Sequence, residues 1–353
     1  LACASTYEVP DIFVEVDKSK ALDIVTWNIE WFGDEENSPS AGDPNSDAIQ
    51  KERVKSTIQE LNADIIAVQE IVDVPLFTEM VNELPNYEFI LSDATSYPND
   101  TAGAKQRIGF IYNSATVNIT SSKVLLESIH PYYNGGDDSA LSNYPVADKT
   151  RFYASGRLPF MITANVTVNG NTQEFNVVNL HARANSGNGA QDRYNMRKFD
   201  VEVLKDTLDA SYSDKNIILL GDYNDDVDET VADVTTTTST YDAFVQDTDN
   251  YSIVSSSLSD LGFRSFVFRE NMIDHITLSN ELTEEHIATS ERVHYEFYNA
   301  TYTNTASDHF PVSTQLLLKT LTIDGLTTTN ATCNGNQDGT VTVNVSGGCA
   351  PYI

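Results

Sequence analysis

The residues best suited to chemistry stand directly after apolar segments of the chain. They fall in the motifs WNIEWFG, VQEI, NLHARA, LLGDYN, IDHI and SDHFPV, and comprise Asn28, Glu30, Glu70, His181, Asp222, Asn224, Asp274, Asp308 and His309. Burying this many polar groups is costly unless a cation or a hydrogen-bond network offsets it. Because the set is rich in oxygen, with few nitrogens and no sulfur, it favours Mg²⁺ or Mn²⁺ over zinc.

An α/β domain would bring these side chains together, since short apolar, β-branched segments alternate with helical patterns along most of the chain. Buried strands are predicted at residues 22–29, 63–71, 108–113, 160–168, 174–182, 216–224 and 272–279. Helices are predicted at residues 190–210 and 46–62, the second with an apolar stripe of Ile49, Val54, Ile58 and Leu61. Polar side chains at strand ends can converge on one crevice.

The charge balance limits how the protein can bind nucleic acid. The chain has 52 Asp plus Glu against 21 Lys plus Arg, a formal net charge of -31. This charge argues against a protein that binds DNA with its whole surface. An enzyme needs only local positive charge. Arg107, Arg157 and Arg183 adjoin the predicted strands, and we predict that they contact substrate phosphate. Ion pairing with the many acids is the alternative.

The ordered series WNIE, QE, NLH, GDYN, IDHI and SDH resembles the endonuclease/exonuclease/phosphatase superfamily, which includes deoxyribonuclease-I-like enzymes, repair nucleases, neutral sphingomyelinases and inositol phosphatases. The resemblance covers about residues 20–319. It implies a four-layered α/β sandwich, with two central mixed β-sheets packed face to face and flanked by helices. A small C-terminal β segment would follow.

The resemblance also implies roles for the residues of the motifs. Asn28, Glu70 and Asp308 would lie around the metal, with Glu30 as a secondary candidate. Asp222 and Asn224 would position the attacking water and a phosphate oxygen, and His309, oriented by Asp274, would act at the scissile phosphate. His181 matches the second histidine of the deoxyribonuclease-like and sphingomyelinase-like branches.

These roles predict a secreted, metal-dependent phosphodiesterase that uses in-line attack of water without a covalent intermediate. We expect an endonuclease that hydrolyses DNA, with RNA as a further substrate. Two alternatives stay open. A phospholipid phosphodiesterase would need an exposed apolar loop, for which residues 130–138 are the nearest candidate. A surface or adhesion protein with an inactive domain is the other.

The two ends of the chain differ from its centre. We predict an N-terminal extension at residues 1–20, the main domain at 21–319, and at 320–353 a β module that resembles part of a SprB-type repeat. Cys333 and Cys349 could form a disulfide in an oxidising compartment, with free thiols as the alternative. The opening LACAS is interpreted as the end of an export signal or as a lipoprotein site at Cys3.

Together these features favour a secreted or cell-surface bacterial protein without a transmembrane segment, since no apolar run reaches the roughly 18 residues required. The acidic run DYNDDVDE has oxygen ligands at alternate positions. A structural Ca²⁺ ion at Asp225, Asp226 or Asp228 is therefore considered, although Val227 stands where such loops have glycine. A solvated acidic turn is the simpler interpretation, and the oligomeric state is left open.

Overall fold

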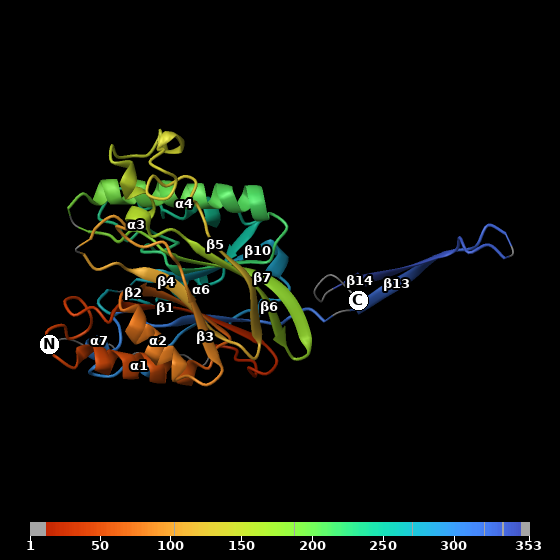
Figure 1. Ribbon diagram of the computed structural model, residues 1–353, viewed down its shortest axis with the longest axis horizontal. Helices are drawn as coiled ribbons and strands as arrows, with labels where there is room; N and C mark the ends of the chain where they lie inside the picture. Colours follow the sequence, from red (N-terminus) through yellow and green to blue (C-terminus); the bar gives the residue numbers. More distant parts are fainter. Residues whose placement is uncertain are drawn as a thin grey trace.

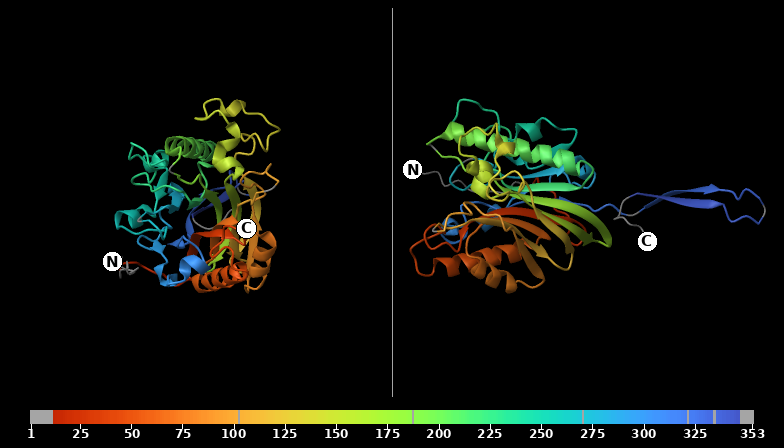
Figure 2. Two further views of the ribbon diagram at one scale, coloured as in Figure 1. Left: turned by 90° about the vertical axis from the view of Figure 1, so that its left-hand side faces the viewer. Right: turned by 45° about the horizontal axis from the view of Figure 1, so that its top comes forward.

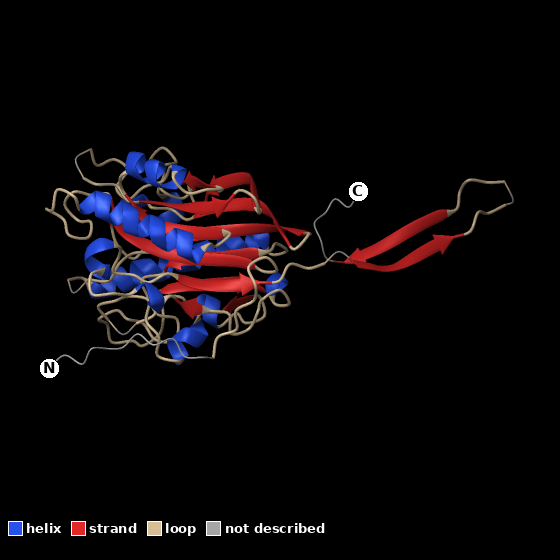
Figure 3. Ribbon diagram, turned by 90° about the horizontal axis from the view of Figure 1, so that it is seen from below, coloured by secondary structure: helices blue, strands red, loops and turns tan. Residues whose placement is uncertain are grey.

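The computed structural model describes residues 12–101, 103–186, 188–269, 271–320, 322–333 and 335–346. Two six-stranded mixed sheets pack face to face, and helices cover both outer faces (Figure 1). This arrangement is the four-layered α/β sandwich that the sequence predicts. A two-stranded sheet projects from the sandwich on one side, well away from the helices (Figure 3).

The first sheet has β1 near its centre, in the order β11-β12-β1-β2-β4-β3. β1 and β2 are parallel, and the other neighbours are antiparallel. Because parallel strands need a crossover, α1 (Ser46–Leu61) connects them. The strands span Leu22–Phe32 (β1), Ile65–Ile71 (β2), Tyr87–Leu91 (β3), Arg107–Asn113 (β4), Arg292–Val293 (β11) and Val312–Leu316 (β12).

The second sheet has the order β5-β6-β7-β8-β10-β9. β7 and β8 are parallel and are connected by α4 (Ala190–Tyr212). β6 and β7 form a hairpin whose Asn169-Gly170 turn has positive φ at both residues, as a tight primed turn requires. The strands span Val117–Val124 (β5), Phe160–Val168 (β6), Asn171–His181 (β7), Ile217–Asp222 (β8), Tyr251–Ile253 (β9) and Asp274–Ser279 (β10).

The helices lie in two outer layers, with α1 and α2 against the first sheet and α4 against the second (Figures 1 and 2). One apolar core fills the space between the sheets and reaches α1 and α2, and a second lies under α4. The remaining α-helices are Val74–Asn82 (α2), Phe152–Gly156 (α3), Asp242–Val245 (α5), Ser256–Asp260 (α6) and Tyr302–Thr305 (α7), and the 3-10 turns are Ser139–Leu141 (η1), Lys149–Arg151 (η2), Asn280–Leu282 (η3) and Tyr295–Phe297 (η4).

One predicted core residue of α1 lies elsewhere. Ile49 is 42% exposed, whereas its neighbour Gln50 is fully buried. The Gln50 amide donates to the carbonyls of Ile29 (2.8 Å), Glu30 (2.8 Å) and Ala306 (3.3 Å). A polar side chain therefore takes the inward position, because it satisfies the backbone where β1 ends and where the segment after α7 passes.

The projecting hairpin consists of β13 (Thr322–Thr329) and β14 (Thr340–Ser346), which pair antiparallel. Cys333 lies exposed in the turn between them, and Cys349 and Cys3 lie outside the described residues, so the disulfide and the lipidation site stay predictions. Among the helices that the structure describes, none combines the length and the apolar character needed to cross a bilayer.

Candidate active site

The second sheet places three predicted residues side by side at one edge. His181 is the last residue of β7, Asp222 is the last of β8, and Asp274 is the first of β10. In the strand register Asp222 pairs with both His181 and Asp274. Three neighbouring strands therefore place a histidine and two carboxylates next to one another at the same end of the sheet.

The first sheet adds Asn28 from β1 and Glu70 from β2. The Asn28 amide nitrogen donates to Glu70 Oε1 (3.1 Å) and to Asp222 Oδ2 (3.0 Å), which joins the two sheets at the site. His181 Nε2 lies 3.3 Å from Asp222 Oδ2 and 3.5 Å from Glu70 Oε1. The structure therefore brings together residues that are more than a hundred positions apart in the sequence.

Several site residues have strained backbones. Glu30, Glu70 and Asn224 have φ values of 43°, 66° and 54°, in the left-handed region that non-glycine residues rarely adopt. Such strain persists only where the surroundings fix it, and it is concentrated at functional sites. Gly221, directly before Asp222, is required for another reason, because a Cβ there would lie 1.9 Å from the carbonyl oxygen of Leu180.

His309 forms the closest contact with a carboxylate in the site. Its Nδ1 lies 2.7 Å from Asp274 Oδ2, and its Nε2 lies 4.0 Å from Asp222 Oδ2. The backbone is also held, since the His309 carbonyl accepts from Trp27 Nε1 (3.0 Å) and from the Tyr302 hydroxyl (2.6 Å). An imidazole fixed at Nδ1 keeps one tautomer and presents Nε2 to the site.

The two histidines have opposite electrostatic surroundings. Burial alone would lower the pKa of His309, but Asp274 and Asp222 outweigh it and raise the pKa well above its usual value. Burial, followed by the positive charges of Arg157 and His309, lowers the pKa of His181 well below its usual value. The site therefore pairs a cationic imidazole with a neutral one.

The carboxyl groups repel one another in the absence of a further cation. Burial raises the pKa of Asp222 to about 7. Burial, with Asp308 and Glu70 nearby, raises the pKa of Glu30 to about 8. Burial and Asp308 raise the pKa of Glu70, and burial raises that of Asp308. Crowded buried carboxylates of this kind are the donor set that a hard divalent cation prefers.

Two groups of side chains offer ligand atoms within 4.8 Å of one another: Glu70, His181 and Asp222, and Asp222, Asp274 and His309. Their chemistry fits a divalent cation. The predicted ligands overlap with the first group through Glu70, whereas Asn28 turns its amide nitrogen, not its oxygen, toward the carboxylates. The ligand roles of Asn28, Glu70 and Asp308 stay predictions.

A cavity of about 650 Å³ opens over these groups. We call it the site cavity; its described lining residues are Glu70, His181, Ala184, Asn185, Ser186, Asp222, Asn224, Val231, Asp233, Phe266, Arg269, Asn271, Ile273, Asp308 and His309. The sequence did not single out Asn185, Phe266 or Arg269. The segment LGFRSFVFRE, which combines aromatic residues with two arginines in an acidic chain, was the available signal for the last two.

The arginines predicted to contact phosphate are not among the described residues that line this cavity. Arg157 is buried and donates to the carbonyls of His181 (3.2 Å) and Ala182 (3.3 Å). Arg183 is also buried and bonds to the Arg151 carbonyl, and Arg107 donates to the Ser92 carbonyl (3.0 Å). Direct phosphate contact by Arg107, Arg157 and Arg183 stays a prediction.

Two carboxylates of the acidic run after Asp222 bond to side chains and amides of neighbouring segments. Asp225 Oδ2 lies 3.1 Å from Arg197 Nη2 and accepts from the Thr240 amide and hydroxyl. Asp226 accepts from the Met272 amide (3.1 Å) and the Ser259 hydroxyl (2.8 Å). These carboxylates are turned to donors that neighbouring loops supply, and a structural Ca²⁺ ion at Asp225, Asp226 or Asp228 stays a prediction.

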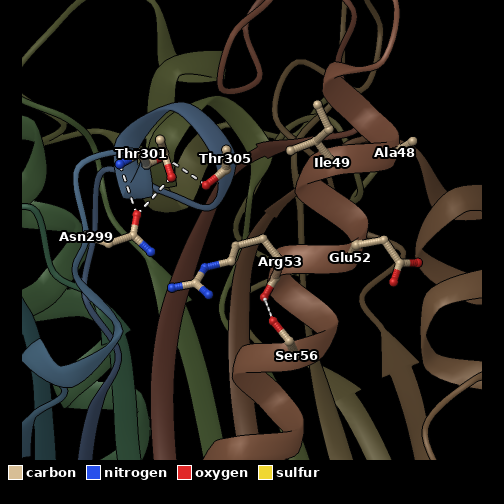
Figure 4. A pocket seen from close by; sticks show the side chains of 8 residues that line it. All are labelled: Ala48, Ile49, Glu52, Arg53, Ser56, Asn299, Thr301 and Thr305. Carbon is tan, nitrogen blue, oxygen red and sulfur yellow. Dashed lines mark hydrogen bonds between the residues drawn. The ribbon is translucent and has the colours of Figure 1, made fainter.

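A second hollow lies between α1 and residues 299–305 (Figure 4). Arg53 points into it, and its Nη2 donates to the Phe297 carbonyl (2.7 Å). The exposed Ile49 is at its rim. None of the predicted site residues is among the described residues that line this hollow, so the chemistry belongs to the site cavity.

Similar solved structures share this architecture. They include an endonuclease/exonuclease/phosphatase from Bacteroides vulgatus (TM-score 0.53, 14% identity, 84% of this chain and 98% of that chain). A mannosyl-6-phosphatase from Bacteroides thetaiotaomicron (0.52, 17%, 84% and 99%) and humanized D. rerio TDP2 (0.51, 14%, 84% and 98%) also match. At these identities the likeness shows the fold alone.

Sequence comparison identifies the family. No curated protein sequence matches the chain. A model of the SprB repeat matches residues 325–352. The model of the Endonuclease/Exonuclease/phosphatase family matches residues 25–309, which hold all the predicted site residues. The chain therefore belongs to the endonuclease/exonuclease/phosphatase family of metal-dependent phosphoesterases.

Proposed function

We propose that this chain is a metal-dependent phosphodiesterase that cleaves nucleic acid, with DNA as its main substrate and RNA as a further one. The observation that carries the proposal is the pair of histidines on either side of Asp222. His181 Nε2 and His309 Nε2 lie 3.3 Å and 4.0 Å from the same Asp222 oxygen, and all three residues line the site cavity. One phosphate can contact both imidazoles there.

Different residues have different roles in the in-line hydrolysis that we propose. Glu70, Asp308 and Asn28 would hold Mg²⁺ or Mn²⁺, which when bound supplies Lewis acidity and neutralises charge on the phosphate. Asp222 and Asn224 orient the attacking water and a phosphate oxygen. His309, held by Asp274, places positive charge beside the phosphate as negative charge develops. His181 donates a hydrogen bond to a phosphoryl oxygen as a neutral imidazole.

The lipid alternative finds little support in residues 130–138. His130 is buried, and Tyr133 turns inward so that its hydroxyl donates to the Gly156 carbonyl (2.7 Å). The exposed part of the segment holds Gly135, Gly136 and acidic residues. An apolar hairpin that could enter a bilayer is therefore not formed by this segment.

The setting that we propose is the surface or the exterior of a bacterial cell. The SprB repeat at residues 325–352 supports it, and so does the strongly acidic composition, which suits an exposed and well solvated protein. The alternative of an inactive adhesion protein is opposed by the predicted site residues that line one cavity, namely Glu70, His181, Asp222, Asn224, Asp308 and His309.

A substrate panel tests the proposal. The full chain is incubated with supercoiled plasmid, linear DNA, RNA, sphingomyelin and mannose 6-phosphate, each with Mg²⁺, Mn²⁺, Ca²⁺ or EDTA. We expect nicking of the plasmid that EDTA abolishes. Turnover of sphingomyelin or of the phosphomonoester, without turnover of either nucleic acid, would overturn the proposal.

A further inference from the structure

The loop between α6 and β10 is fixed against the catalytic residues. The Val267 amide donates to the Asp308 carbonyl (2.8 Å), and the Phe310 amide donates to the Ser265 carbonyl (2.7 Å). The Ser265 hydroxyl accepts from the Asp274 amide (3.0 Å). The loop is therefore tied to the segment that carries Asp308 and His309 and to the strand that carries Asp274.

This loop exposes an aromatic ring, that of Phe268, next to Phe266, which lines the site cavity. Phe263 and Val267 are buried, and the Phe266 ring lies 5.2 Å from the His309 ring. Phe268 is 66% exposed, the highest value among the aromatic side chains in the described chain, and its ring meets Phe266 edge-on at 5.8 Å. Leaving a phenylalanine in water on an anchored loop forgoes the burial that its neighbours achieve.

Arg269 places a positive charge beside that ring. It is the one arginine or lysine among the described residues that line the site cavity. It has no carboxylate or hydrogen-bond partner in the part of the chain that the structure describes, although the protein has 52 acidic residues. An unpaired guanidinium at the mouth of a phosphate site is available to an anion of the substrate.

We propose that residues 266–269 form a strand-binding lip, in which Phe268 stacks on a nucleobase near the scissile bond and Arg269 contacts a neighbouring phosphate. An aromatic face next to a guanidinium is the combination that binds unpaired nucleic acid without sequence preference. This inference rests on the proposed function and predicts that, among nucleic acids, chains with unstacked bases are the preferred substrate. A sugar phosphate or a single lipid headgroup would leave Phe268 without a partner.

Two strands of equal length test the contact between Phe268 and a base. One is a twelve-residue thymidine strand, and the other is built only from abasic tetrahydrofuran units, so the two differ in the presence of bases. Stacking contributes about 1–3 kcal/mol per base, so F268A should lower kcat/KM on the thymidine strand about 5- to 160-fold. On the abasic strand the same variant should change kcat/KM less than about twofold. F268W should restore activity on the thymidine strand because it keeps an aromatic face.

Leu261→Ala is the matched control, since Leu261 is 57% exposed at the end of α6 and does not line the site cavity. It should leave both rates unchanged. An F268A variant that loses nothing, or that loses equally on both strands, would overturn the proposal. Loss of binding to phosphatidylcholine vesicles, with an unchanged rate on the thymidine strand, would assign the ring to a membrane instead.

Binding in EDTA separates this inference from the proposed function. Fluorescence anisotropy of the labelled strands measures binding and needs no turnover. If the wild-type protein cleaves nothing, the proposed nuclease activity is refuted, but binding of the strands by residues 266–269 can still be measured. R269A should weaken binding of both strands and reduce the slope of log affinity against log salt by about 0.7, the value for one contact with a single strand. An unchanged slope would remove Arg269 from the proposal.

Discussion

Replacing Asp274 with asparagine removes the charge behind His309 and keeps the shape of the side chain. The 2.7 Å contact between Asp274 Oδ2 and His309 Nδ1 is buried, so it is a strong charge-assisted hydrogen bond that fixes the tautomer and favours the cation. Loss of such support costs about 10²–10⁴ in kcat, or about 3–5 kcal/mol in activation free energy. KM should change little, because Asp274 is not among the described residues lining the site cavity.

The assay is steady-state cleavage of single-stranded DNA with Mg²⁺, together with urea unfolding of each variant. Asp228→Asn is the control for the change of charge, since Asp228 is exposed, is not among the described residues lining the site cavity, and its carboxylate accepts from the Glu229 amide. It should keep wild-type kcat. A folded Asp274→Asn variant that retains more than about a tenth of the wild-type kcat would refute the reasoning.

Further predictions concern stability, each measured as the free energy of unfolding in urea. Gly221→Ala should destabilise the protein by at least about 3 kcal/mol, because the new Cβ would collide with the Leu180 carbonyl; a change below about 1 kcal/mol would contradict this. Asp225→Ala should lower the free energy of unfolding by about 3–5 kcal/mol, because it leaves the Arg197 guanidinium buried without its carboxylate partner. Arg197→Met should lower it less, because the Asp225 carboxylate then keeps four other hydrogen-bond donors. A larger loss for Arg197→Met would contradict this reasoning. Burial raises the pKa of Asp200 to about 8, so its carboxyl group destabilises the fold increasingly as the pH rises from about 4 to 8. Asp200→Asn should therefore stabilise the protein at pH 9, less at pH 5 and not at pH 3; an equal gain at all three would rule out ionisation as the cause.

The buried strands could be predicted because their apolar runs are continuous. The seven predicted strands correspond to β1, β2, β4, β6, β7, β8 and β10, and the two predicted helices to α1 and α4. These strands carry Asn28, Glu70, His181, Asp222 and Asp274, whereas Asp308 and His309 lie between α7 and β12. The parallel pairs β1/β2 and β7/β8 each enclose one of the two helices.

The edge strands β3, β5, β9 and β11, and the inner strand β12, could not be predicted in the same way. β5 has the sequence VNITSSKV and is mostly exposed, so it lacks the apolar run of a buried strand. β3, β9, β11 and β12 are short, and β12 pairs with β1 across almost the whole chain. Nothing local in the sequence of β12 indicates that pairing, because it depends on the sandwich closing.

The arginines show that the direction of a long side chain could not be predicted from the sequence either. Arg157 and Arg183 adjoin predicted strands in sequence, but their guanidinium groups bond to backbone carbonyls inside the protein. Arg269 stands four residues before the motif IDHI, was not among the arginines predicted to contact phosphate, and lines the site cavity. The direction in which a long side chain turns depends on which backbone groups near it are unsatisfied, and that information is tertiary.

Cleavage of supercoiled plasmid by the wild-type protein and by His309→Ala tests the central claim most directly. With Mg²⁺ or Mn²⁺ the wild-type protein should nick the plasmid, EDTA should stop the reaction, and the folded His309→Ala variant should be at least about 100-fold slower. A folded wild-type protein that cleaves no phosphodiester with either metal, or a His309→Ala variant as fast as the wild type, would contradict the assignment of this cavity as a hydrolytic site.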